Sequence, residues 1–119
     1  MAAFRDYHRL THENPQAKTD YKIFAHKVCL QPYEGMPSMY LFHNAEFIER
    51  TQFWYKNMEY PKERERGLEA HEDHYCPFAL HFDLNRGGDC YIVASTCEYE
   101  RFDVLELFHN EIGRRKNIH

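Results

Sequence analysis

The chain has 119 residues, of which 43% are hydrophobic and 16% aromatic, so it is long enough for one domain with a packed core. Its formal charge is −4, from 19 acidic and 15 basic side chains, which gives no electrostatic reason to expect nucleic-acid binding. A neutral, heavily hydroxylated ligand is compatible with this balance.

Two β-prone runs come first, at residues Ile23 to Leu30 and Ser38 to His43. The sequence QPYEGMP lies between them, and its Pro32, Gly35 and Pro37 favour a turn and oppose a continuous helix. We therefore predict a hairpin with a long loop.

A charged middle segment extends from Lys56 to His74. Pro61 and Gly67 interrupt any helix longer than about a turn or two in this segment. We predict a long, irregular but ordered excursion between two hairpins.

The run from Phe78 to Leu84 alternates apolar and polar side chains with the period of two that is typical of a strand with one buried face. The sequence NRGGD then favours a turn, and Cys90 to Thr96 is another β-prone run. We predict that these two runs form the second hairpin.

The last segment, from Asp103 to Lys116, has a helical period. Asp103 and Glu106 have the spacing of a capping box, and the basic residues 114–116 suit the negative end of a helix dipole. One apolar stripe contains Leu105, Phe108 and Ile112, with Val104 beside it. The pattern predicts an amphipathic helix whose stripe covers the sheet of this domain or a partner.

The thiols and the N-terminus indicate the compartment. None of the four cysteines (Cys29, Cys76, Cys90 and Cys97) forms a C-x-x-C pair, so reduced thiols in a cytoplasm are the simpler interpretation. The N-terminal sequence MAAFRDYHRL has no apolar signal-peptide segment, and no stretch approaches the roughly 20 apolar residues that span a bilayer. We expect a cytoplasmic protein with no membrane partner.

Three acids, Glu69, Glu72 and Asp73, lie within five residues of one another. Paired carboxylates can act as general acid and base when their environments separate their pKa values. Adjacent acids on an exposed loop usually remain ionised and solvated, and this is the interpretation that we favour.

A possible metal site consists of His71, His74 and Cys76. Imidazole and thiolate are zinc ligands, but the H-x-x-H-x-C spacing lacks a distant matching pair and is not a strong zinc signature. We therefore favour no metal and no other cofactor.

The triplet Phe53, Trp54 and Tyr55 could stack on the apolar faces of sugar rings. Core or interdomain packing is the more common destination of neighbouring aromatics, and we favour it. Near the N-terminus, the segment from Arg5 to His8 favours a structural polar network. The sequence has no Ser-His-Asp order, phosphate-binding glycine loop or nucleotide fingerprint.

Five blocks of sequence occur in one order along the chain: FRDYHRLTHENP (4–15), QPYEGMPSMYLFHNAEF (31–47), WYKNMEYPKERERGLEAHEDHYCP (54–77), FDLNRGGDCYIVAST (82–96) and RRKNI (114–118). They resemble the amino-terminal domain of bacterial and archaeal glycogen debranching enzymes of the amylo-α-1,6-glucosidase type. The collinearity of the blocks is far more specific than any short pattern within them.

The resemblance implies a mainly β fold, a partial β-supersandwich of antiparallel hairpins with a C-terminal amphipathic helix. Residues 1–119 would form a single domain that resembles the C-terminal half of the family's amino-terminal sandwich. The family's catalytic domain is a toroid of paired helices, and the two carboxyl groups that glycoside hydrolysis needs would lie there. We thus expect this chain to be non-catalytic alone and to serve α-1,6 debranching of glycogen or α-glucan through the complete enzyme.

By the same resemblance, the candidates for carbohydrate or interdomain contact are Trp54, Tyr55, Arg66, Glu72 and Asp73. The expected partners are the catalytic helical domain and, through the complete enzyme, an α-glucan. Open backbone edges of an incomplete sandwich also predict self-association. A stand-alone glucan- or protein-binding β module is the alternative, and a metal-binding protein is a weaker one.

Overall fold

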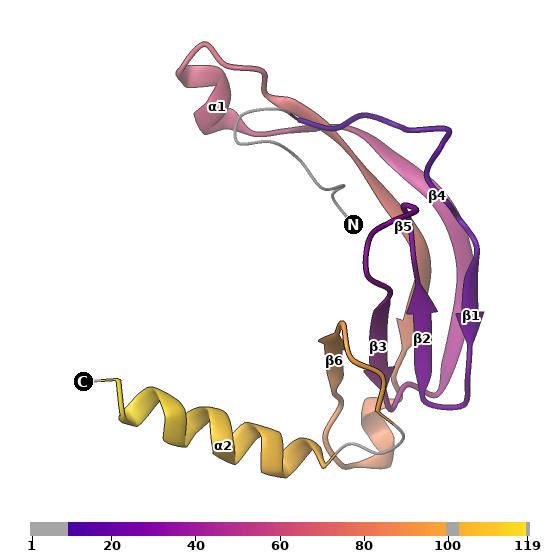
Figure 1. Ribbon diagram of the computed structural model, residues 1–119, viewed down its shortest axis with the longest axis vertical. Coiled ribbons are helices and arrows are strands. Elements are labelled where there is room, and N and C mark those ends of the chain that lie inside the picture. The colour runs from indigo at the N-terminus through magenta and orange to yellow at the C-terminus, as the bar shows by residue number, and fades with distance from the viewer. Residues whose placement is uncertain (1–9, 100–102, 119) are drawn as a thin grey trace.

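The computed structural model describes residues 10–99 and 103–118 (Figure 1). The elements are β1 (Tyr21–Ile23), β2 (Lys27–Leu30), β3 (Met39–His43), β4 (Phe47–Glu59), α1 (Pro61–Glu65), β5 (His71–His81), a 3₁₀ turn η1 (Leu84–Arg86), β6 (Ile92–Ser95) and α2 (Val104–Lys116). The strands form two antiparallel sheets, one with the order β1-β2-β3-β6 and one in which β4 pairs with β5. The mainly β fold with a C-terminal helix is therefore confirmed.

The first β-prone run is two strands. The N–H of Phe24 donates to the carbonyl of Lys27 over 2.8 Å, so the chain reverses there and Tyr21 pairs with Leu30. The prediction of one continuous strand from 23 to 30 is wrong because this tight turn contains no glycine, proline or asparagine to mark it. The hairpin with a long loop, between β2 and β3, is confirmed.

The second predicted hairpin is wrong. β5 contains the alternating residues, but it pairs with β4, and β6 pairs with β3, where Leu41 lies opposite Ala94. The segment between them forms η1, and Gly87 and Gly88 follow it with φ angles of 73° and 90°, which direct the chain away from β5. An alternating pattern identifies a strand but does not identify the partner of that strand.

The charged middle segment is mostly regular secondary structure: the end of β4, the helix α1 and the start of β5. β4 continues to Glu59, α1 closes the tip of the hairpin, and β5 begins at His71, so the predicted irregular excursion is wrong (Figure 1). Only the tip follows the prediction, since Pro61 stands in the first turn of the five-residue helix and Gly67 lies beyond its end. Long strands with charged side chains arise here because much of the hairpin faces solvent.

Two bulges interrupt the β4–β5 ladder. At the first, Thr51 and Gln52 of β4 lie opposite Pro77, which has no N–H to donate to a ladder. The Oγ1 of Thr51 donates to the carbonyl of Cys76 over 3.0 Å instead. The second bulge places two residues of β4 opposite Asp73. Each bulge contains one residue with positive φ, Gln52 at 48° and Asn57 at 57°.

Replacing Gln52 by glycine is expected to raise the free energy of unfolding by about 0.5–1 kcal/mol, because glycine adopts the left-handed backbone without a Cβ penalty. Urea unfolding followed by circular dichroism measures this gain. Thr51→Gly, the neighbouring position in the bulge, is the control and should be destabilising. A loss of stability in Gln52→Gly contradicts the prediction.

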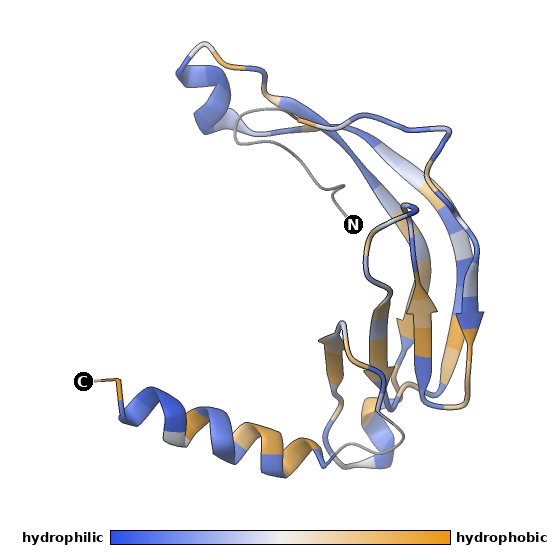
Figure 2. Ribbon diagram, viewed as in Figure 1, coloured by the Kyte–Doolittle hydropathy of each residue, from blue (hydrophilic) through white to orange (hydrophobic). Residues whose placement is uncertain are grey.

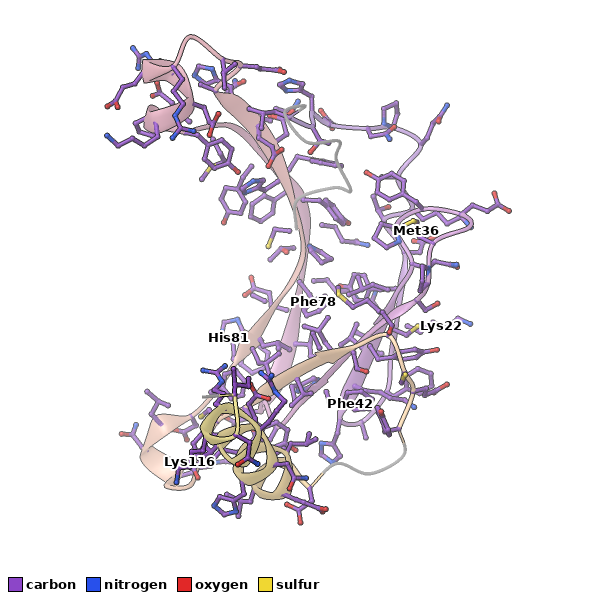
Figure 3. All side chains as sticks on the ribbon, turned by 60° about the vertical axis from the view of Figure 1, so that its left-hand side comes forward. Lys22, Met36, Phe42, Phe78, His81 and Lys116 are labelled. Atoms are coloured by element: carbon purple, nitrogen blue, oxygen red, sulfur yellow. The ribbon has the colours of Figure 1, made fainter. Side chains whose placement is uncertain are left out.

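The core lies between the four-stranded sheet and the base of the hairpin. Its buried apolar residues are Tyr21, Val28 and Leu30, against which Met39, Leu41, Ile48 and Phe78 pack. The rings of Tyr21 and Phe78 are 5.3 Å apart, and Figure 3 shows Phe78 between the sheets while Lys22 points outward. Apolar residues gather in this part of the molecule, while the far end of the hairpin is hydrophilic (Figure 2).

The C-terminal helix is confirmed with its cap. The N–H of Glu106 donates to the Asp103 side chain over 3.0 Å, and the three basic residues stand in the last turn. None of its residues is buried, and α2 points away from both sheets (Figure 1). Within the described ranges, no helix is long and apolar enough to cross a membrane.

Candidate functional site

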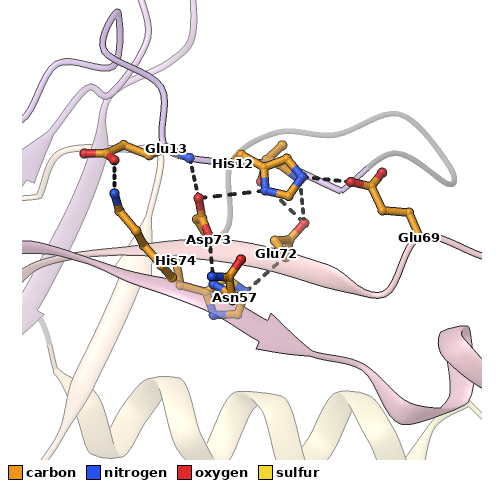
Figure 4. A network of polar contacts seen from close by, with 9 residues as sticks. His12, Glu13, Asn57, Glu69, Glu72, Asp73 and His74 are labelled. Carbon is orange, nitrogen blue, oxygen red and sulfur yellow. Dashed lines mark hydrogen bonds and ion pairs between the residues drawn. The ribbon is translucent and has the colours of Figure 1, made fainter.

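The far end of the β4–β5 hairpin holds a polar network that also includes the segment 11–13 (Figure 4). The segment lies along the edge of β5, where the N–H of Asp73 donates to the carbonyl of Thr11 over 2.8 Å. Figure 4 shows Glu72 and Asp73 between this segment and the hairpin. We call Glu72 and Asp73, with their donors Thr11, Glu13, Asn57 and Tyr60, the carboxylate clamp.

Glu72 is fully buried and both of its carboxylate oxygens are engaged. Oε2 accepts from the N–H of Thr11 at 3.0 Å and lies 3.3 Å from its hydroxyl. Oε1 accepts from the Tyr60 hydroxyl at 3.0 Å and lies 3.1 Å from Nε2 of His74. These contacts replace the water that a buried carboxylate loses.

Asp73 fills the second bulge. Its carboxylate accepts from the N–H of Glu13 at 2.7 Å and from the N–H of Asn57 at 2.9 Å. These hydrogen bonds hold the pKa of Asp73 below its usual value, because they favour the ionised form. The prediction that the acids lie solvated on an exposed loop is therefore wrong for Glu72 and Asp73, which belong to a strand and are 0% and 6% exposed.

Exposed ion pairs surround the carboxylate clamp. Nε2 of His12 lies 2.8 Å from Oε1 of Glu69, and its Nδ1 lies 3.8 Å from Oδ2 of Asp73. The hydrogen bond to Glu69 raises the pKa of His12. Nζ of Lys56 lies 2.6 Å from Oε2 of Glu13. All three contacts link the segment 11–13 to the hairpin, although exposed pairs of this kind contribute little stability singly.

The lowered pKa of Asp73 predicts a pH dependence of stability. A carboxyl whose folded-state pKa lies below its unfolded value of 3.8 stabilises the fold above that value, and this contribution is lost as the pH falls through the folded-state pKa. Asp73→Asn is expected to be less stable at pH 7 and to lose this part of the acid dependence. Urea midpoints measured between pH 7 and pH 2.5 check this prediction, and the exposed Asp20→Asn serves as the control. If the midpoints of Asp73→Asn and wild type change with pH in parallel, the prediction is contradicted.

The carboxylate clamp is suited to holding backbone segments together. General acid–base catalysis needs a carboxyl group with access to a substrate, whereas both acids here accept hydrogen bonds from protein donors. Both carboxylates instead hold the segment 11–13 against the hairpin, since Glu72 accepts from the N–H of Thr11 and Asp73 accepts from the N–H of Glu13.

The aromatic triplet divides between the two faces of β4. Trp54 is half-buried and its ring lies 5.2 Å from that of Tyr75, so it packs. Phe53 and Tyr55 stand edge to face with ring centroids 4.7 Å apart and are 40% and 51% exposed. Tyr55 also borders a shallow groove of about 380 Å³, which is otherwise lined by Leu30, Met39, Leu41, His74, Tyr75, Cys76, Pro77 and Phe78.

The remaining candidates lie apart from one another. Arg66 follows α1 at the exposed tip of the hairpin, 3.9 Å from Glu63. His74 contacts Glu72 and Tyr60, the thiol of Cys76 lies 3.4 Å from the Thr51 hydroxyl, and His71 is exposed at the start of β5. Among the described residues, no three acidic, histidine or cysteine side chains are grouped as a metal site. The network expected for residues 5–8 lies outside the described residues.

Sequence reasoning missed the donors of the carboxylate clamp. Thr11, Tyr60 and the backbone of Asn57 come from three separate segments, and no spacing in the sequence brings them to Glu72 and Asp73. The pairing of β4 with β5 would have brought these residues together, but it can be inferred only if the two ends of the charged middle segment are assigned as strands.

In a comparison with known families, residues 1–91 match the family described as glycogen debranching enzyme N terminal. No curated protein and no solved structure matches the chain. The matched range includes the strands β1 to β5 and every residue of the carboxylate clamp, and it ends before β6 and α2.

Proposed function

The chain belongs to the family of glycogen debranching enzyme N-terminal domains, and we propose from this that it is a non-catalytic part of such an enzyme in the cytoplasm. The complete enzyme would hydrolyse α-1,6-glucosidic branch linkages of glycogen or a related α-glucan. The carboxyl groups for this reaction would come from a helical catalytic domain. The family match over residues 1–91 is the observation that carries the proposal.

The state of the two buried carboxylates supports a non-catalytic role. Hydrolysis of a glycosidic bond needs one carboxyl group that protonates the leaving oxygen and another that activates water or attacks the sugar. Glu72 has both oxygens occupied by protein donors, and Asp73 accepts two backbone N–H groups that favour its ionised form. Both carboxylates are engaged by protein donors, so we assign neither residue to the chemistry.

An association assay tests the proposed role. The purified chain is mixed with the helical catalytic domain of a glycogen debranching enzyme produced without its own N-terminal domain, and glucose release from a branched maltooligosaccharide is measured. We expect the two to associate and the mixture to release more glucose than the helical domain alone. No association and no gain, with the chain shown to be folded by circular dichroism, would contradict the proposal.

A stand-alone glucan-binding module is the second candidate, and one observation favours it. Phe53 and Tyr55 present exposed aromatic surface on one side of β4, and Tyr55 borders a groove with apolar walls. Aromatic side chains of this kind can stack on the apolar faces of sugar rings. The polar edges of a bound glucan would then face solvent and the hydroxyl of Tyr55.

Titration with linear maltooligosaccharides separates this candidate from the first. Trp54 is the only tryptophan, and its ring lies 5.2 Å from that of Tyr75, which lines the groove, so we use its fluorescence to detect binding there; calorimetry measures the affinity. A glucan-binding module should bind, and Tyr55→Ala should weaken binding while Tyr33→Ala in the β2–β3 loop should not. No fluorescence change and no heat of binding would exclude a sugar platform at this position.

A further inference from the structure

The apolar stripe of α2 has no cover within the described part of the chain. Leu105 and Phe108 are 62% and 60% exposed, and Ile112 is 36% exposed one turn further on. Large apolar side chains in a row on one helix are unusual on a free surface, because each loses the stabilisation that burial gives. The stripe therefore indicates an interface.

A groove opens beside the first half of this stripe. It has a volume of about 900 Å³ and is lined by Asp89, Cys90, Tyr91, Asp103, Val104, Leu105 and Phe108. Its walls are mainly apolar, and Asp89 and Asp103 give it an acidic rim. The groove suits an apolar segment that ends in cations.

The chain itself contains such a segment. The second half of α2 has Ile112 on the apolar stripe and Arg114, Arg115 and Lys116 in the last turn. It cannot enter the groove of its own copy, because the first half of the same helix forms one wall of that groove. A 13-residue helix is about 20 Å long and rigid over this length, and α2 carries its C-terminal end away from the body of the molecule (Figure 1).

We propose that the occupant is α2 of a second copy, packed antiparallel to the first about a two-fold axis. In this arrangement Ile112 of each copy lies in the groove of the other, and the two Phe108 side chains lie near the axis. The antiparallel direction places the basic last turn of one helix beside the acidic rim of the other copy, and it opposes the two helix dipoles. A two-fold axis repeats each contact, so one patch serves both copies.

Asp89 and Lys116 are the charged side chains that this pairing brings together. Within the described residues neither has an ion pair inside its own copy, whereas Arg114 and Arg115 already pair with Glu111. Asp89 stands at the rim of the groove near the beginning of α2, and Lys116 ends the helix that would enter it. The pairing thus gives both charges a partner.

Sedimentation equilibrium over a wide range of protein concentration tests the dimer. We expect a monomer–dimer equilibrium for the wild type and a monomer for Phe108→Glu, which places a charge at the centre of the interface. Phe47→Glu, at an exposed phenylalanine of β4, is the matched control and should still dimerise. A monomeric wild type, as expected if only a helical catalytic domain covers the stripe, overturns the proposal, and so does dimerisation of folded Phe108→Glu.

A charge exchange tests the antiparallel register. Asp89→Lys and Lys116→Glu should each weaken the dimer by roughly fivefold, since each places like charges opposite one another at a solvent-exposed rim. The double variant, Asp89→Lys with Lys116→Glu, restores opposite charges and should regain most of the affinity. If the double variant is as weak as the product of the two single losses, these side chains do not meet and the register is wrong.

Discussion

Replacing Glu72 by alanine is expected to lower the free energy of unfolding by roughly 3 kcal/mol, because it removes the acceptor for the Thr11 amide and the Tyr60 hydroxyl. The same change removes the contact that ties the segment 11–13 to β5 from one side. Urea unfolding followed by circular dichroism measures the loss. A domain of this size has only about 5–15 kcal/mol of stability, so the substitution should lower the urea midpoint of unfolding by a large fraction.

Glu69→Ala is the matched control for this prediction. Glu69 is also a glutamate of the network, but its contact with His12 is exposed and should contribute less than about 1 kcal/mol. Equal losses for Glu69→Ala and Glu72→Ala would contradict the assignment of Glu72 as the buried centre of the carboxylate clamp.

The second large effect is expected in the core. Leu30→Ala should cost about 2–5 kcal/mol, because Leu30 is 4% exposed and belongs to the cluster that joins the four-stranded sheet to the hairpin. Removing its methyl groups leaves a cavity that the strands on both sides can fill only in part. The free energy of unfolding, again from urea titration, measures the cost.

Leu84→Ala provides the same chemical change at a surface position. Leu84 begins η1 and is 80% exposed, so its truncation should change the unfolding free energy by less than about 0.5 kcal/mol. If both leucine variants are equally stable, the core does not lie between the two sheets as described.

Local patterns in the sequence identified the elements whose signal is local. The spacing of Asp103 and Glu106, the apolar stripe and the basic last turn together predict α2, and the structure contains this helix with its cap. Pro32, Gly35 and Pro37 likewise predict the loop between β2 and β3. Each of these signals acts within a few residues, so a single chain is sufficient to recognise it.

Which strands pair with each other could not be predicted from local patterns. The residues from Phe78 onward alternate whether β5 pairs with β6 or with β4, and the choice depends on which strand presents a matching buried face. Lys56 to Glu59 end a strand although they are exposed and two of them are charged, because Met58 and Glu59 pair with β5 and the N–H of Asn57 donates to the Asp73 carboxylate. The polar side chains of this segment reflect its exposure to solvent and give no pattern from which a strand could be predicted.

The sequence pointed to two acids of the network, Glu72 and Asp73, but the prediction of their environment was wrong. Glu72 and Asp73 were selected for their carboxylates, but their burial follows from a bulge and from the segment 11–13, about 60 residues away in sequence. The bulge gives Asp73 two partners on β4 where an ordinary ladder gives one. This arrangement turns two apparently solvated acids into a carboxylate clamp.

The proposed non-catalytic role is tested most directly by incubating the purified chain with a branched maltooligosaccharide and measuring glucose release over time, with Glu72→Gln in parallel. We predict no release above the rate without protein, for either form, because the buried carboxylates are held by the fold. Steady release by the wild-type chain that is lost in folded Glu72→Gln would show that the chain itself cleaves the bond and that Glu72 takes part, which contradicts the account.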